Sequence, residues 1–545
     1  MTTETAAKDR ISPVVRRAGE GPRLPVWVPW LLALFFAAGA LRGVNQAVIT
    51  DTDAARHAMN GAFLYDMVRL GHLTQPTVYA KEYYGHFPAL SLPFHPPGFP
   101  AIEAVFFAIF GVKVLSSRLA VALAVGICAF LLYQLIRATW GNDVLAACVT
   151  VATLSTWLSG YVSTDVMLEF PALAFALAAL LCLRNLDRVY TMRRALLFAF
   201  FAAAAVWTKQ QTAFLLGVPL LLAILGRRWS LLREKPFWIS SAIVAIAIAG
   251  VTFAWSIFRG FDMPDANMVG TTPHALGFIF IRNLGVYGDW MVANLLWLPA
   301  IFALCAVLVY AWAVFRGCRK KLGGRLPAAW ILSVAGLLMV LGAASPRYLF
   351  WLLPAVIGLV YAMLFRGSSY LWGERWASCL AAGFALAWLV HGLSFQPEYL
   401  HGPAEAAALV TRDQVPSRII YAGEADGNFT FAVRTHDPKL QTAIIPGGKF
   451  PQDVFAPAAL EQFCRDYGIN WIVIEDTSIA HKWSDLLKNP PSTMQLVTSI
   501  PMTSSRVRWR TGAVRIFRFT APSDHPRNLL SIPIRKLGRS IEVRM

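Results

Sequence analysis

Charged residues are scarce in this chain. Asp, Glu, Lys and Arg together make up 15% of its 545 residues, whereas 57% are hydrophobic. Soluble globular domains carry about 25% charged residues, so the composition excludes a soluble globular protein as a description of the whole chain. It indicates a protein that crosses a membrane several times.

Cysteine is also sparse, with seven in the chain. Most lie in long apolar segments, and Cys464 alone lies in a C-terminal region of soluble composition. A disulfide framework needs several cysteines in an exported region, and a Cys-based zinc site needs them closely spaced. The sequence therefore predicts neither.

Acidic residues are the minority charge, with 31 Asp and Glu against 49 Lys and Arg and a net charge of +18. Most of the excess lies in the N-terminal tail and in alternate short loops between apolar segments. Because basic residues resist translocation, this asymmetry predicts a cytoplasmic N-terminus and a C-terminus outside. Topology accounts for the charge, so we expect no nucleic-acid partner. The opposite short loops hold Lys209, Arg259, Arg282 and Arg347.

Long apolar segments dominate the first 395 residues. About 20 apolar residues cross roughly 30 Å of hydrocarbon, and the sequence predicts about eleven such helices, with no signal peptide before the first. Segment 99–111 is too short to cross and predicts a helix in the membrane interface. The predicted spans are 26–41, 115–136, 144–161, 166–183, 195–207, 212–225, 237–258, 291–315, 327–344, 348–365 and 376–395.

Composition also divides the chain into regions. We expect a cytoplasmic tail at 1–25, a membrane domain at 26–395 whose first outer loop is 45–114, and a soluble domain outside at 396–545. The fold class is thus mainly α, a multi-pass protein of the cytoplasmic (inner) membrane followed by a small α/β or α+β domain. In that domain 418–422 and 471–474 predict buried strands, 457–467 a helix, and 506–519 a half-exposed hairpin.

Two carboxylates follow the first predicted span. Asp51 and Asp53 open an amphipathic stretch in which Met59, Phe63 and Met67 recur at helical spacing. This pattern predicts a helix lying on the membrane with Asp53 at or near its N-cap. A cap uses one carboxylate, so the second one points to chemistry at the outer surface.

The rest of the loop carries an ordered set of motifs. Tyr83-Tyr84-Gly85-His86 and His95-Pro96-Pro97 lead into the interfacial helix, which ends in Phe110-Gly111-Val112 before Arg118-Leu119. Downstream, the motifs are Glu169-Phe170-Pro171, Thr208-Lys209 and Arg347-Tyr348-Leu349. Over roughly residues 25–365 the chain resembles the dolichyl-phosphate-mannose protein mannosyltransferase superfamily. Bacterial relatives include the 4-amino-4-deoxyarabinose lipid A transferases, and the shared architecture is called GT-C.

This resemblance implies an inverting glycosyltransferase. It would move a sugar from a polyprenyl-phosphate donor to a lipid, glycan or protein acceptor at the outer face of the membrane. The chemistry needs a carboxylate to accept the proton of the acceptor hydroxyl, and cations to meet the charge of the leaving phosphate. We assign the first role to Asp53 and the second to Lys209 and Arg347. Glu169 is expected to orient the acceptor or to hold Lys209.

The chain departs from the family pattern at the phosphate site and at the acidic pair. Relatives often carry Lys before Pro-Pro, whereas this chain has His95, which is neutral at pH 7 unless an anion raises its pKa. His86 is an equal candidate for phosphate contact. The motif from Asp53 to His57 aligns with Asp-Glu-x-Arg-Tyr, which favours Asp53 as the base and leaves Asp51 as the extra acid.

Further contacts are open at this stage. A divalent metal could bridge Asp51, Asp53 and Glu169 with phosphate, although their spacing does not require one. The expected substrate-binding residues are Tyr83, Tyr84, Tyr348 and Asp165. We expect acceptor choice to depend on the loop 259–290 and on the soluble domain.

Two other classes of function remain. A transporter or flippase of a lipid-linked sugar would place charges near the midplane on broken helices and would show repeated halves. Here the charges gather at one face, and no repeat of 20 residues or more is visible. An anchored binding module is the third class, but eleven spans exceed what an anchor needs.

Overall fold

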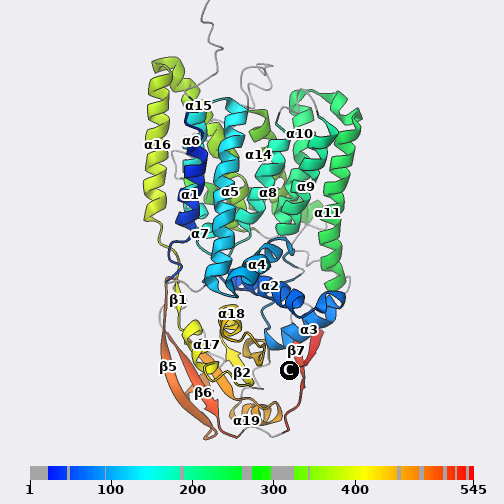
Figure 1. Cartoon of the computed structure of the whole chain (residues 1–545), viewed down its shortest axis with the longest axis vertical. Coiled ribbons are helices and arrows are strands. Elements are labelled where there is room, and N and C mark those ends of the chain that lie inside the picture. Colours follow the sequence, from blue (N-terminus) through cyan, green and yellow to red (C-terminus); the bar gives the residue numbers. More distant parts are fainter. Residues whose placement is uncertain are drawn as a thin grey trace, which may run out of the picture.

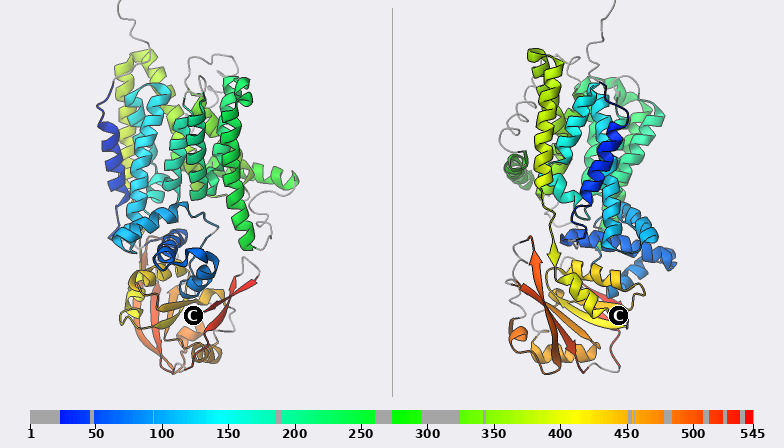
Figure 2. Two further views of the ribbon diagram at one scale, coloured as in Figure 1. Left: turned by 45° about the vertical axis from the view of Figure 1, so that its right-hand side comes forward. Right: turned by 60° about the vertical axis from the view of Figure 1, so that its left-hand side comes forward.

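The structure is a computed structural model, and it divides into a helical bundle, a middle layer and a C-terminal α/β domain (Figure 1). Both views of Figure 2 show α2, α3 and α4 between the bundle and the domain. The structure describes residues 23–45, 49–92, 94–184, 190–259, 273–295, 324–341, 344–450, 454, 456–477, 484–506, 512–521, 525–534 and 539–544.

Helices of the bundle run between its two ends, and the described basic segments 227–235 and 366–375 lie at the end away from the C-terminal domain (Figure 1). Small residues allow close packing: a Cβ at Gly126 of α5 would lie 3.1 Å from the carbonyl oxygen of Ala33 in α1. The bundle comprises α1 (Val28–Ala40), α5 (Val114–Trp140), α6 (Asp143–Leu154), α7 (Trp157–Ser163), α8 (Glu169–Cys182), α9 (Met192–Thr208), α10 (Gly217–Gly226), α11 (Lys235–Arg259), α14 (Arg325–Val340), α15 (Leu353–Trp372) and α16 (Glu374–Ser394).

By length and composition, four of the described helices, α5, α11, α15 and α16, can cross a membrane. A fifth span results if α6 and α7, which meet at a 68° bend, are counted together. Thr156 makes this break, because its hydroxyl accepts a hydrogen bond from the Ser159 amide and caps α7. Each predicted span except 291–315 contains a described helix, and most of 291–315 lies outside the described residues. Eleven spans therefore stays a prediction.

The middle layer consists of α2 (Thr52–Arg69), α3 (Pro76–His86) and α4 (Gly98–Phe110). In the structure α2 packs between α4 and α18 (Asp426–His436) of the C-terminal domain, and its place on the membrane surface stays a prediction. Its buried positions therefore go round the helix, with Ala55, Met59 and Asn60 all below 1% exposed. The N-cap is Asp51, whose side chain accepts a hydrogen bond from the Asp53 amide, and Asp53 lies in the first turn.

Segment 259–290 was expected to be a loop, but α12 (Pro273–Leu295) occupies much of it. Ile279, Asn283 and Tyr287 recur every four residues and are buried, and α12 packs against α14 and the 3-10 helix η4 (Pro346–Trp351). The helical period was therefore present in the sequence. The surrounding polar residues and glycines obscured it.

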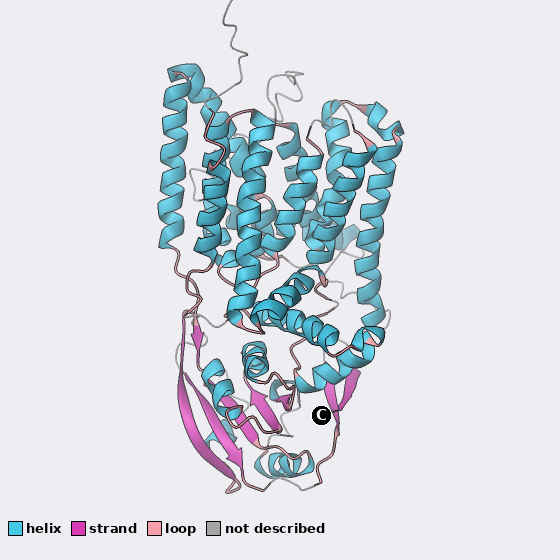
Figure 3. Ribbon diagram, in the orientation of Figure 1, coloured by secondary structure: helices cyan, strands magenta, loops and turns pink. Residues whose placement is uncertain are grey.

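Strands in the described chain are confined almost entirely to the C-terminal domain (Figure 3). Its six-stranded sheet has the order β1-β5-β6-β4-β2-β3, in which β2 is parallel to β3 and β4 while the other pairs are antiparallel. The strands are β1 (Leu400–His401), β2 (Ser417–Ala422), β3 (Thr442–Pro446), β4 (Trp471–Thr477), β5 (Met494–Ser504) and β6 (Gly512–Phe519). The helices are α17 (Pro403–Val410), α18, α19 (Pro457–Asp466) and α20 (Ser484–Lys488).

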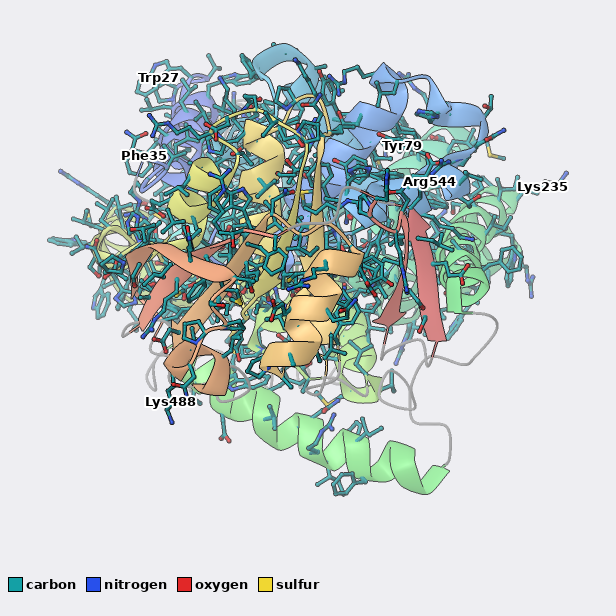
Figure 4. All side chains as sticks on the ribbon, turned by 90° about the horizontal axis from the view of Figure 1, so that it is seen from below. Trp27, Phe35, Tyr79, Lys235, Lys488 and Arg544 are labelled. Carbon is teal, nitrogen blue, oxygen red and sulfur yellow. The ribbon has the colours of Figure 1, made fainter. Side chains whose placement is uncertain are left out.

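The two predicted strands and the helix of this domain coincide with β2, β4 and α19. The predicted hairpin at 506–519 is wrong in its pairing, because β6 forms its hairpin with β5, and 507–511 lie outside the described residues. A second hairpin, β7 (Leu529–Ile534) with β8 (Arg539–Arg544), packs on α3. Figure 4, seen from the domain end, shows Arg544 of β8 beside α3, which carries Tyr79.

Candidate active site

Four elements bring charged side chains together at the end of the bundle that faces the C-terminal domain. They are the start of α2, the segment from α7 into α8 and the end of α9 (Figure 1), together with η4. The side chains they carry are Asp51 and Asp53, Asp165 and Glu169, Lys209, and Arg347. These are residues that the sequence motifs singled out.

Asp53 pairs with Arg347. The guanidinium Nη2 of Arg347 donates a hydrogen bond to Asp53 Oδ2 over 2.8 Å, and the side chains are 33% and 25% exposed for Asp53 and Arg347 respectively. Burial raises the pKa of Asp53, but the hydrogen bond and charge of Arg347 outweigh it, so the pKa lies below its usual range. Asp53 is therefore ionised at neutral pH, as a proton acceptor must be, and it is open to a ligand.

Glu169 pairs with Lys209. The Lys209 Nζ lies 2.5 Å from Glu169 Oε1, and the side chains are 0% exposed for Glu169 and 7% for Lys209. Thr208 ends α9 and Lys209 follows in extended backbone, which turns the ammonium toward the start of α8. Of the two predicted roles for Glu169, the geometry favours holding Lys209. The second oxygen, Glu169 Oε2, is buried and has no hydrogen-bond partner among the described residues.

Asp165 organises the backbone before α2. Its Oδ2 accepts hydrogen bonds from the amides of Thr50 and Asp51, over 3.2 and 2.9 Å, and from the Thr50 hydroxyl over 2.8 Å. Its Oδ1 accepts from the amide of Val166. These partners occupy both oxygens of Asp165, so the structure favours a role in shaping the site over the predicted contact with substrate.

Two histidines lie next to these ion pairs. The rings of His57 and His95 are 4.6 Å apart and nearly perpendicular. His57 Nδ1 lies 3.0 Å from the Val166 carbonyl oxygen, which can only accept, so Nδ1 carries the proton and Nε2 is an acceptor. Burial lowers the pKa of His57 to about 4 and that of His95 well below its ordinary value. In the described part of the chain, His57 Nε2 and His95 Nδ1 have no partner.

Three predicted site residues lie where α3 meets the C-terminal domain: two contact the domain directly, and the third contacts a residue of α2. Tyr83 donates a hydrogen bond to Asp66, Tyr84 meets Lys449, and the ring of His86 lies 3.1 Å from the Thr442 carbonyl oxygen. All three belong to α3, which packs on β3 and β8. The structure therefore does not bring them to Asp53, whereas Tyr348 follows Arg347 in η4 and stays beside the site.

Sequence reasoning missed Arg506. Its Nη2 lies 3.0 Å from Asp51 Oδ2, although the two residues are 455 positions apart. Arg506 belongs to the C-terminal domain, and no local pattern marks it. The signal that could have found it is chemical: an acid at the end of the bundle with no basic neighbour in sequence needs a partner from elsewhere.

A bridging metal has little support in this geometry. Among the residues that the structure describes, no group of three His, Cys, Asp or Glu side chains is arranged to hold one. The three carboxylates proposed as ligands each face a cation: Asp51 faces Arg506, Asp53 faces Arg347, and Glu169 faces Lys209. The site is therefore a network of ion pairs.

Known proteins resemble both the sequence and the fold. Residues 94–255 match the family described as dolichyl-phosphate-mannose-protein mannosyltransferase. No curated protein sequence matches the chain. The fold resembles that of ArnT from Cupriavidus metallidurans in the apo state, at 14% identity and a TM-score of 0.58, and bound to undecaprenyl phosphate, at 13% and 0.55. In both cases the match covers 90% of this chain and 97% of ArnT.

Proposed function

We propose that the chain is a membrane glycosyltransferase of the GT-C type, which transfers a sugar from a polyprenyl-phosphate donor to a lipid, glycan or protein acceptor. The family match of residues 94–255 and the likeness of the fold to ArnT support this proposal. The reaction takes place at the outer face of the cytoplasmic membrane and inverts the anomeric centre. The observation that carries the proposal is the pairing of Asp53 with Arg347 next to Glu169 and Lys209. It puts an accessible carboxylate and two cations at one end of the bundle.

Asp53 is the general base of this proposal. The acceptor hydroxyl oxygen attacks the anomeric carbon and forms the new glycosidic bond, while its proton passes to the Asp53 carboxylate. The bond from the anomeric carbon to the phosphate oxygen breaks at the same time, and the polyprenyl phosphate leaves with the electron pair. The hydroxyl attacks the face of the sugar opposite to the leaving phosphate, so a single displacement inverts the configuration of the anomeric carbon.

Lys209 and Arg347 meet the leaving phosphate. An ammonium has three N–H donors and a guanidinium five, so each can hold its carboxylate and still donate to phosphate oxygens. When phosphate engages Arg347, the hold of that arginine on Asp53 weakens and the carboxylate becomes more basic as the proton arrives. The ArnT structure that holds undecaprenyl phosphate supports this class of donor.

The neutral imidazoles suit a hydroxyl-bearing sugar. His57 Nε2 and Glu169 Oε2 are buried acceptors without partners among the described residues, and such atoms are costly unless a ligand or water supplies a donor. A sugar hydroxyl is a donor of this kind. Neutral His95 replaces the cation that relatives place before Pro-Pro, so the phosphate charge rests on Lys209 and Arg347.

The test is a comparison of envelope glycolipids and glycoproteins by mass spectrometry in cells with and without the protein. We expect one glycan substituent to disappear with the protein, and its linkage in the normal product to have the anomeric configuration opposite to that of the lipid-linked donor. An unchanged set of glycans, or a product that retains the donor configuration, would overturn the proposal. A flippase would move the intact lipid-linked sugar and form no glycosidic bond in proteoliposomes.

A further inference from the structure

Arg506 reaches from the C-terminal domain into the network of charges at the bundle. Its Nη2 lies 3.0 Å from Asp51 Oδ2 and 2.7 Å from Glu398 Oε2, and its Nε lies 2.9 Å from the same Glu398 oxygen. One guanidinium thus joins a carboxylate of the middle layer to one of the segment after α16. Planar arginine suits such a bridge, and lysine, with one point charge, does not.

The domain fixes where Arg506 stands. Strand β5 ends at Ser504, which pairs with Leu400 of β1, and the Ser504 hydroxyl oxygen accepts a hydrogen bond from the Arg506 amide over 3.0 Å. The side chain is 19% exposed. Arg506 is therefore placed by the edge of the sheet, and its position follows that of the domain.

Asp51 links this arginine to the proposed base. Its Oδ2 accepts from Arg506 and from the Tyr161 hydroxyl, over 3.0 and 2.8 Å, while its Oδ1 accepts from the Asp53 amide over 2.8 Å. The last bond caps α2, the helix that carries Asp53. Loss of the contact between Arg506 and Asp51 would therefore affect the first turn of α2 through the hydrogen bond between Asp51 and the Asp53 amide.

Charge balance gives Arg506 a second effect. Asp51 and Asp53 lie two residues apart, and Asp51 interacts with the charge of Arg347, the partner of Asp53, as well as with that of Arg506. With Arg506 in place there are two arginines for the two carboxylates. Without it, Asp51 would compete with Asp53 and with donor phosphate for Arg347.

We propose that Arg506 is a positioning residue through which the docked C-terminal domain sets the geometry of Asp53. It acts by holding Asp51, which caps α2 and leaves Arg347 to Asp53 and to the donor phosphate. Transfer by the bundle then depends on the domain being in place. This proposal rests on the proposed function.

The same domain has another attachment to α2, which makes Arg506 testable. Arg434 of α18 pairs with Asp66 near the far end of α2, with side chains only 3% and 0% exposed. Loss of Arg506 leaves this buried pair intact, so we expect the domain to stay docked and the protein to fold. A fluorescence-detected size-exclusion profile of the full-length protein in detergent checks that expectation.

The first measurement is transfer by Arg506→Gln in the full-length protein with the donor that the wild type uses. We expect kcat to fall about 10- to 100-fold and KM for the lipid donor to rise by a smaller factor, because the lost contact positions the base and reaches the phosphate only through the competition for Arg347. Arg506→Lys should recover only part of the loss. The matched control is Arg515→Gln, which breaks a half-exposed pair with Asp476 in the same domain and should stay within about twofold of the wild type.

A double-mutant cycle separates a positioning role from a structural one. If Arg506 acts through Asp51, then Arg506→Gln should cost less than about twofold in a chain that already carries Asp51→Asn. Losses that multiply would overturn the proposal, and so would an Arg506→Gln enzyme as active as the Arg515→Gln control.

Hydrogen exchange provides a readout that does not depend on catalysis. In Arg506→Gln the amides of Asp53 and Ala55, which bond to the side chain and carbonyl of Asp51, should exchange faster than in Arg515→Gln. Equal exchange in the two variants would overturn the inference even if sugar transfer is demonstrated. If the wild type transfers no sugar, the proposed function fails, and the exchange result still decides whether Arg506 holds the start of α2.

Discussion

The two ends of α2 carry the same kind of ion pair in opposite surroundings. Near its start, Asp53 meets Arg347 with both side chains a quarter to a third exposed, and near its end Asp66 meets Arg434 with both nearly sealed. Asp66 accepts two hydrogen bonds from Arg434, over 2.7 and 2.9 Å, and one from the Tyr83 hydroxyl. The sealed pair is thus saturated by protein, whereas the open pair leaves room for a ligand.

The difference in exposure distinguishes an ion pair that stabilises the structure from one that a substrate can reach. A buried ion pair balances a large desolvation cost only when its remaining lone pairs and protons are satisfied, and that condition holds at Asp66. Asp53 makes one hydrogen bond with Arg347 and keeps contact with solvent, so a substrate can displace water there at small cost. The same residue types therefore dock a domain at one end of the helix and, in the proposed mechanism, support catalysis at the other.

The largest effect is expected from Asp53→Asn. Removal of a general base lowers the rate by about 10²- to 10⁴-fold, and we expect a loss of about 10³-fold in kcat. The asparagine keeps the size of the side chain, so expression and binding of undecaprenyl phosphate, measured by native mass spectrometry, should be retained. Full transfer activity in this variant would remove Asp53 from the mechanism and with it the contrast between the two ends.

Loss of the buried pair near the end of α2 should lower the stability of the folded protein. Asp66→Asn leaves the Arg434 guanidinium buried without its counter-charge, and breaking a buried pair in this way costs about 3–5 kcal/mol. We expect a clear fall in the melting temperature in detergent and in the docking of the C-terminal domain, with a smaller loss of activity per folded molecule than in Asp53→Asn.

The matched control for the sealed pair is Asp426→Asn. Asp426 lies 3.4 Å from Arg56 in the same interface, but these side chains are 26% and 34% exposed. An exposed pair contributes about 0–1 kcal/mol, so the control should melt close to the wild type. A melting temperature for Asp66→Asn no lower than that of Asp426→Asn would contradict the comparison.

Local patterns in the sequence were enough to predict much of the fold and to select several charged residues that the structure brings together. Apolar length marked the bundle helices, and the period in Met59, Phe63 and Met67 marked α2. The motifs around Glu169 and Lys209 led to a pair that the structure brings within 2.5 Å. These signals succeed because they are carried by neighbouring residues and by the chemistry of single side chains.

The rest required long-range contacts. The partner of Asp53 is 294 positions away, and that of Asp66 is 368 positions away. The apolar face of α2 could pack on lipid or on protein, and the sequence alone did not predict that α18 of the C-terminal domain packs against this helix. His86 illustrates the converse error, since a histidine in a motif-rich loop turns out to contact the Thr442 backbone of the C-terminal domain.

The smallest effect concerns pH and the open end of α2, where His57 lies one turn after Asp53. Burial lowers the pKa of His57 in the folded protein to about 4, whereas an unfolded chain has a value of about 6.5. The unfolded state therefore takes up a proton first as the pH falls, so this contribution to stability is complete above about pH 6.5 and is lost toward pH 4. Between pH 7.5 and pH 5 the loss is about 2 kcal/mol, and buried His95 adds to it with the same sign. The lowered pKa of Asp53 puts its titration below this window.

Melting temperatures at pH 7.5 and pH 5 measure how much stability the protein loses when its unfolded state binds a proton at His57. We expect the wild type to lose several degrees at pH 5, and His57→Gln, whose amide can still donate to the Val166 carbonyl, to lose fewer. His401→Gln is the control, because that side chain is 40% exposed and lies in the C-terminal domain; its dependence on pH should match the wild type. A His57→Gln protein with the full wild-type dependence would show that the acid sensitivity arises away from Asp53, and the open end of α2 would then differ from the sealed end in ligand access alone.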